Sequence, residues 1–154
     1  MSDLHSTLSS VLADRYAANA ARVRELGAPL TNSQFWQKPF PFGNSFGHLV
    51  LHLTGNLNYY IGARVAENGY VRDRDREFTE PDHKAKAEVL AAFDRAIAMV
   101  IETIEEQSAD DWQKPYTAVR EPEAAERFAI FLRCAGHAYH HVGQLIYLSR
   151  ELRK

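Results

Sequence analysis

Two histidines near the C-terminal end of the sequence have a spacing at which they could bind one metal ion together. The run His137-Ala138-Tyr139-His140-His141 lies in a stretch with the composition of a long helix. Residues four apart stand above one another on the same face of a helix, about 6 Å apart at Cβ. His137 and His141 would therefore present two imidazoles side by side, although histidines at this spacing also occur as ordinary helix-surface residues.

A second pair with the same spacing strengthens the metal hypothesis. His48 and His52 lie four residues apart in an apolar segment that is also typical of a helix. Four of the seven histidines thus form two such pairs on two different helices. Imidazole nitrogen is a good ligand for first-row transition metals, and a helical bundle can direct side chains from facing helices into one interior site. The other elements should be those that bring these two helices together.

The overall composition indicates an ordinary globular protein and argues against several classes of function. The 154 residues are 45% hydrophobic and 25% charged, which is typical of a single globular domain, here residues 1–154. The net charge of −2 and the lack of a long basic run argue against a nucleic-acid partner. No apolar run approaches the roughly 20 residues of a membrane span. With one cysteine, Cys134, and no signal-peptide pattern, we expect the protein in the cytoplasm.

Apolar periodicity predicts an all-α fold. Apolar residues recur at helical spacing, and glycine and proline mark the breaks. The predicted helices cover residues 3–26, 45–67, 82–107 and 121–152. The connections between them cover residues 27–44, 68–81 and 108–120. In the third helix a 3-4 spacing typical of a bundle seam runs through Leu90, Phe93, Ile97, Val100 and Ile104. We therefore predict a four-helix bundle.

The composition of the first two connections, residues 27–44 and 68–81, suggests where each of them lies. The first is rich in aromatic residues, so we expect it to fold back over one end of the bundle. The second alternates arginine and aspartate, which is typical of a solvated loop. In the alternative interpretation, Arg72, Arg74 or Arg76 lies across the mouth of the site and holds an anionic group of a substrate.

His141 lies in the apolar seam of the last predicted helix, so its ring nitrogens need partners. A buried imidazole without such a partner costs free energy. Nearby seam residues such as Leu49 and Leu145 offer no carboxylate, so we expect a metal. Cys134 faces the same way as His141 and could be a thiolate ligand, although buried cysteine is usually a small apolar residue. His140 is about 100° around the helix and should point elsewhere.

Two further patterns on the predicted helices leave alternatives open. Gly55 and Gly62 lie on one face of the second helix, where glycine lowers helix stability. Either another helix approaches closely there, or the glycines leave space beside His52. The last helix is apolar over a wide arc, so it is either central or shared with a second subunit, and we predict a homodimer. The second apolar stripe of this arc comprises Phe128, Ala135, Tyr139, Val142 and Ile146.

Taken together, these motifs resemble the DinB/YfiT-like superfamily. The resemblance extends over almost the whole chain. It rests on the segment 44–53 with His52, on the arginine-rich connection 72–78, and above all on the run HxxxHxGQ at residues 137–144. The family usually has a tryptophan at the start of the second helix, where this sequence has Asn44.

The resemblance implies a fold and a ligand set. Family members are small four-helix bundles with up-down-down-up topology and are commonly dimers. One histidine of their second helix and the HxxxH pair of the fourth helix bind a divalent metal, which implies His52, His137 and His141 as ligands here. His48 could be a fourth ligand, a proton carrier or a packing residue. Zinc or nickel is the expected metal, with manganese and iron as alternatives.

Three histidine ligands would leave a coordination position open, as in catalytic rather than structural zinc sites. A metal of this kind favours ionisation of a bound water or thiol. Some relatives use thiols in this way, as bacillithiol transferases or mycothiol-dependent isomerases. We therefore expect hydrolysis or thiol S-transfer on a small-molecule substrate, possible catalytic residues being Tyr59 and Gln144, with Asn56 nearby. Gln144 could instead form a helix–helix hydrogen bond. The alternative function is a non-catalytic metal-binding stress-response bundle that acts through dimerisation.

Overall fold

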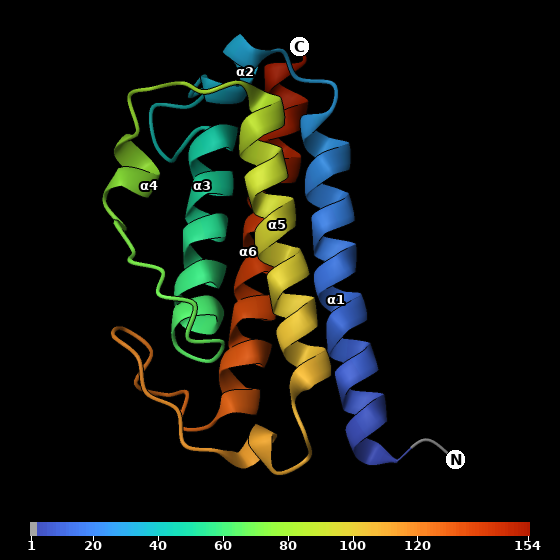
Figure 1. Ribbon diagram of the computed structural model, residues 1–154. Coiled ribbons are helices and arrows are strands. Elements are labelled where there is room, and N and C mark those ends of the chain that lie inside the picture. The colour runs from blue at the N-terminus through green and yellow to red at the C-terminus, as the bar shows by residue number, and fades with distance from the viewer. Residues whose placement is uncertain (1–2) are drawn as a thin grey trace.

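The structure is a computed structural model that describes residues 3–154, and over this range it is built from helices without a β-strand (Figure 1). The six α-helices are α1 (Leu4–Gly27), α2 (Asn32–Trp36), α3 (Phe46–Leu57), α4 (Arg76–Thr79), α5 (Lys86–Glu106) and α6 (Arg127–Leu152). The short helices are the π-helix η1 (Asn58–Ala63) and the 3-10 helix η2 (Asp111–Gln113). The predicted all-α fold class is therefore confirmed.

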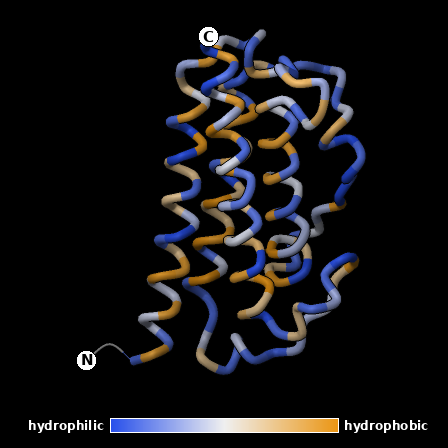
Figure 2. The backbone as a smooth tube through the Cα atoms, turned by 180° about the vertical axis from the view of Figure 1, so that it is seen from behind, coloured by the Kyte–Doolittle hydropathy of each residue, from blue (hydrophilic) through white to orange (hydrophobic). Residues whose placement is uncertain are grey.

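The four long helices α1, α3, α5 and α6 lie side by side and enclose the core (Figure 1). Hydrophobic and hydrophilic residues alternate along each of them (Figure 2), as expected for helices with one buried face. Tyr16 Oη donates to Phe131 O over 2.6 Å, and Ser149 Oγ donates to Leu26 O over 2.9 Å. Because the residue numbers of the two pairs rise together, α1 and α6 run in the same direction.

The helices begin and end a few residues away from their predicted positions. The second predicted helix ends as a π-turn at Ala63 instead of residue 67. The third begins at Lys86 instead of residue 82. The fourth begins at Arg127 instead of residue 121, because residues 121–126 run back along the preceding connection and Tyr116 N donates to Ala125 O over 2.9 Å. Apolar periodicity does not detect such a pairing between two extended segments.

The connection before α3 packs on one end of the bundle through part of its aromatic residues. Phe35 and Trp36 are buried, and a Cβ atom at Gly47 of α3 would lie 2.6 Å from the Trp36 ring. Gln34 Nε2 donates to Leu152 O over 2.6 Å, which ties this connection to the end of α6. Phe42, by contrast, is 74% exposed. The predicted cover is therefore made by Phe35 and Trp36, with the partly buried Phe40 packed against the core beside them. Among the helices of residues 3–154, none is long and apolar enough to cross a membrane.

Candidate metal centre

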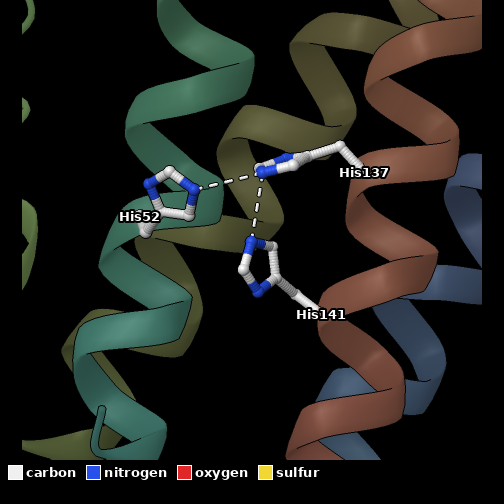
Figure 3. Close-up of side chains that lie close together, drawn as sticks. All are labelled: His52, His137 and His141. Carbon is white, nitrogen blue, oxygen red and sulfur yellow. Dashed lines mark hydrogen bonds between the residues drawn. The ribbon is translucent and has the colours of Figure 1, made fainter. Parts of the chain in front are cut away.

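Three histidine side chains from two helices point towards one another (Figure 3). His52 comes from α3, and His137 and His141 come from successive turns of α6. Nε2 of His137 lies 3.1 Å from Nε2 of His52 and 3.0 Å from Nε2 of His141. The possible ligand atoms of the three residues all lie within 4.8 Å of one another. The three residues that the resemblance implied are thus brought together.

The tautomers of two of these rings follow from their outer partners. His52 Nδ1 lies 2.8 Å from Glu77 Oε2, and His141 Nδ1 lies 2.7 Å from Gln144 Oε1. Each oxygen can only accept a hydrogen bond, so each Nδ1 carries the proton. Nε2 of His52 and Nε2 of His141 therefore carry lone pairs, and both are directed at Nε2 of His137.

The donor set fits a divalent metal. One N–H of His137 cannot fully satisfy two lone pairs, whereas a cation can be bound by all three Nε2 atoms. Zinc–nitrogen bonds of 2.0–2.1 Å in a tetrahedron separate the nitrogens by about 3.3 Å, which is close to the separations of 3.0 and 3.1 Å here. Nδ1 of His137 is buried, and no residue from 3 to 154 forms a hydrogen bond with it.

Burial keeps two of the three histidines in the neutral form that can bind a metal. Burial, together with the neighbouring imidazoles of His141 and His52, lowers the pKa of His137 to about 3. Burial likewise lowers the pKa of His141 to about 4. Both rings are therefore neutral at physiological pH, and a neutral imidazole is the form that binds a metal. His52 is buried, while His137 and His141 are half-buried, so the centre lies where α3 and α6 meet solvent.

A carboxylate contacts the site, contrary to the expectation that none would be nearby. Glu77 lies on α4, outside the long helices, and binds both His52 and the Arg72 guanidinium. The seam positions of the long helices gave no sign of it. The one signal was Gly55, where a Cβ atom would overlap the Glu77 carboxylate. The space that Gly55 leaves beside His52 is therefore not open but is filled by the Glu77 side chain of α4.

The arginines of the second connection have different surroundings. The Arg72 side chain is 9% exposed and is paired with Glu77, so it is neither solvated nor free for a substrate. Arg74 lies over the ring of Phe78, and the exposed Arg76 pairs with the half-buried Glu80.

The other candidate ligands lie outside the three-histidine group. His48 Nδ1 lies 2.7 Å from Ser45 Oγ, and its Nε2 lies 3.1 Å from Glu80 O. Both ring nitrogens of His48 are therefore occupied, one by the N-cap of α3 and the other by Glu80, which fastens the second connection to α3. Cys134 is buried, which raises the pKa of its thiol and disfavours a thiolate. His140 is exposed, as expected, although its ring lies edge-on to that of His141 with the ring centres 5.1 Å apart.

The two predicted catalytic residues have different positions. Gln144 bonds to His141 on its own helix, so it forms no helix–helix hydrogen bond through that oxygen. Tyr59 lies seven residues after His52, about 10 Å along the helix axis, and its hydroxyl accepts a hydrogen bond from Val119 N over 3.4 Å. Asn56, between them, is buried, and its Oδ1 has no hydrogen-bond partner in the described part of the chain.

Comparison with known proteins now identifies the family. The sequence matches the family model of the DinB superfamily over residues 15–145. The chain belongs to the DinB superfamily. The matched region includes the three histidines, Glu77 and Gln144.

A solved structure supports the fold of this DinB-like protein. The crystal structure described as the conserved protein of a locus from Enterococcus faecalis has a TM-score of 0.76 at 13% sequence identity. The alignment covers 94% of this chain and 96% of that chain. At this identity the likeness concerns the fold alone. A search of the curated proteins gives no match.

Proposed function

We propose that this DinB-like protein is a metal-dependent enzyme that performs hydrolysis or thiol S-transfer on a small substrate. The observation that carries the proposal is the convergence of three Nε2 atoms, from His52, His137 and His141, at a place that solvent can reach. Structural zinc sites are closed by four protein ligands, whereas catalytic sites use three and keep one position for water or substrate. Zinc or nickel is the proposed metal, with manganese and iron as alternatives.

The surrounding residues define what such an ion would do. When bound, it would supply Lewis acidity that favours loss of a proton from a water or thiol. Glu77 and Gln144 hold the rings of His52 and His141 so that their lone pairs face inward. No residue of the group is a built-in carboxylate base, because Glu77 is occupied by His52 and Arg72. The proton would therefore leave with solvent or with the substrate's leaving group.

A groove next to the site suggests the size and polarity of the substrate. It has a volume of about 240 Å³ and is lined mainly by apolar and aromatic side chains, among them Phe40, Phe42, Leu49 and Tyr147. Gln144 also lines this groove and bonds to Nδ1 of His141, so the groove lies on the outer side of His141, and none of the three histidines lines it. We propose that it accepts the apolar part of a small electrophile. Tyr59 would contribute only if the substrate extends about 10 Å along α3.

We also propose a helix order and an oligomeric state for this protein. We infer the up-down-down-up order of the long helices from the parallel direction of α1 and α6 and from the arrangement in Figure 1. We further propose a homodimer. Much of the apolar arc of α6 is covered by the bundle itself, but Leu132, Tyr139 and Tyr147 stay 57%, 63% and 73% exposed.

The test is an activity screen of metal-loaded protein. Untagged protein is analysed for its native metal, loaded with zinc or nickel, and assayed with model esters, amides and electrophiles in the presence of low-molecular-weight thiols. Turnover that disappears in His137→Ala would support the proposal. A fully loaded protein that turns over none of these substrates would contradict it and favour a non-catalytic metal-binding bundle.

A further inference from the structure

We propose that Glu77 is a positioning residue of the metal centre, and that Arg72 holds Glu77 in place. This inference rests on the proposed metal site and extends it to a residue outside the long helices. In this arrangement, metal affinity depends on a buried chain of contacts from Arg72 through Glu77 to His52.

The contacts in this chain are short and shielded from water. Glu77 Oε2 accepts from His52 Nδ1 over 2.8 Å and from Arg72 Nη2 over 2.9 Å, and Glu77 Oε1 accepts from Arg72 Nε over 2.7 Å. The three side chains are 6–9% exposed. The two-point contact with the guanidinium fixes the plane of the carboxylate. That plane in turn determines where the His52 ring can sit.

The fold makes specific room for this carboxylate. Gly55 lies three residues after His52, about one turn further along α3, and a Cβ atom there would overlap Glu77 Oε1. A glycine inside a helix lowers its stability, so its use at this position is explained by the carboxylate that it admits. The Arg72 guanidinium also lies over the ring of Tyr60, 5.5 Å from its centre, and this cation–π contact adds a second restraint on it.

The role of Glu77 follows from the requirements of a histidine ligand. A histidine that binds a metal through Nε2 must carry its proton on Nδ1, and a carboxylate acceptor there fixes the tautomer, orients the ring and makes it a stronger ligand. A purely structural role is the competing interpretation, in which Glu77 only fastens the second connection to α3. The two interpretations differ in the metal affinity of a folded protein.

The first measurement is the zinc affinity of Glu77→Gln, determined by competition with a chromophoric chelator. We expect a loss of 10- to 100-fold, the range typical of lost outer partners of metal ligands. The matched control is Glu80→Gln, which weakens the ion pair with Arg76, outside the three-histidine group, and should leave the affinity unchanged. Gly55→Ala, which displaces the carboxylate but keeps its charge, should weaken zinc binding as Glu77→Gln does.

A second measurement on the wild-type protein does not depend on any variant folding. In the zinc-loaded protein, nitrogen-15 NMR should show Nδ1 of His52 protonated and Nε2 bound to metal. Zinc bound through Nδ1 of His52, or folded Glu77→Gln and Gly55→Ala with wild-type affinity, would overturn the inference. Wild-type protein that binds no zinc, nickel, manganese or iron would instead overturn the metal centre itself.

Discussion

At the scale of single residues, neighbours determine what each histidine can do. His48, His52, His140 and His141 all lie on the two helices that form the site. They differ in the hydrogen-bond partners of their ring nitrogens. His48 has hydrogen bonds at both ring nitrogens, and His140 is exposed. His52 and His141 have a partner only at Nδ1 from outside the group, so their Nε2 atoms remain for a shared ion.

Two adjacent histidines of α6 provide a matched test of the ligand set. His141→Ala should weaken zinc binding by at least about 100-fold, beyond the 10- to 100-fold typical of a lost outer partner, because a ligand itself is removed. His140→Ala removes the neighbouring exposed imidazole and should leave zinc affinity unchanged. Isothermal titration of both variants gives the comparison. Equal losses in the two variants would speak against His141 as a ligand.

The low pKa values of His137 and His141 predict how the metal-free protein responds to acid. Each pKa lies below the ordinary histidine value of about 6.5, at about 3 and about 4 respectively. The unfolded chain therefore binds more protons than the folded protein in this range, so stability is fully present above about pH 6.5 and falls as the pH is lowered towards these values.

Urea denaturation of the metal-free protein between pH 7.5 and pH 4.5 checks this effect. The free energy of unfolding should fall more steeply with acidity in the wild type than in His137→Gln, whose amide does not titrate. The difference between the two proteins isolates this histidine from carboxylates that also protonate in acid. Parallel curves would show that His137 contributes no pH dependence.

At the scale of elements, the start of α5 holds the end of α1 and the connection that follows it. Lys86 Nζ donates to Gly27 O over 3.2 Å and to Ala28 O over 2.9 Å, and it also contacts Leu30 O. A cation at the C-terminal end of a helix satisfies carbonyl groups that lack intrahelical partners. This contact keeps α2 and its buried Phe35 and Trp36 over the end of the bundle.

Removing this lysine should therefore lower stability. We expect Lys86→Met to cost about 1.5–3 kcal/mol, the range for hydrogen bonds to a charged group. Lys84→Met is the control, because the Lys84 side chain forms an exposed ion pair with Glu88 and such pairs contribute about 0–1 kcal/mol; the hydrogen bond from Trp36 goes to the Lys84 backbone carbonyl, which the substitution keeps. Chemical denaturation measures both. A Lys86→Met protein as stable as Lys84→Met would refute the capping role.

The long helices were predictable from sequence, whereas the surroundings of the site were only partly so. Apolar periodicity located α1, α3, α5 and α6 because each buries one face, and the HxxxH spacing placed His137 and His141 on adjacent turns. Glu77 was missed because it reaches His52 from a separate short helix, 25 residues further along the chain. A single sequence does not encode that contact in any local period; only the glycine at position 55 hinted at it.

At the scale of the whole molecule, the exposed face of α6 should mediate dimerisation. Its large apolar side chains, Leu132, Tyr139 and Tyr147, are interspersed with Gly136 and Gly143, where a Cβ atom would meet nothing within 4 Å. Two copies of such a face can approach closely about a two-fold axis, since the same surface serves both subunits.

Sedimentation velocity at micromolar concentration tests the assembly. The wild type should sediment as a dimer, and Leu132→Glu should shift it to a monomer because a charge would be buried at the interface. Val71→Glu, at a site 88% exposed on the second connection, is the control and should remain a dimer. A wild-type monomer would rule out this interface.

The central claim is that three histidines bind one divalent ion that keeps a position for water or substrate. X-ray absorption at the zinc edge of the zinc-loaded protein tests it most directly, because it reports the number and type of the ligand atoms. We predict three imidazole nitrogens and at least one oxygen ligand, with one imidazole lost in His52→Ala. A spectrum with four imidazoles, or with fewer than three in the wild type, would contradict the account.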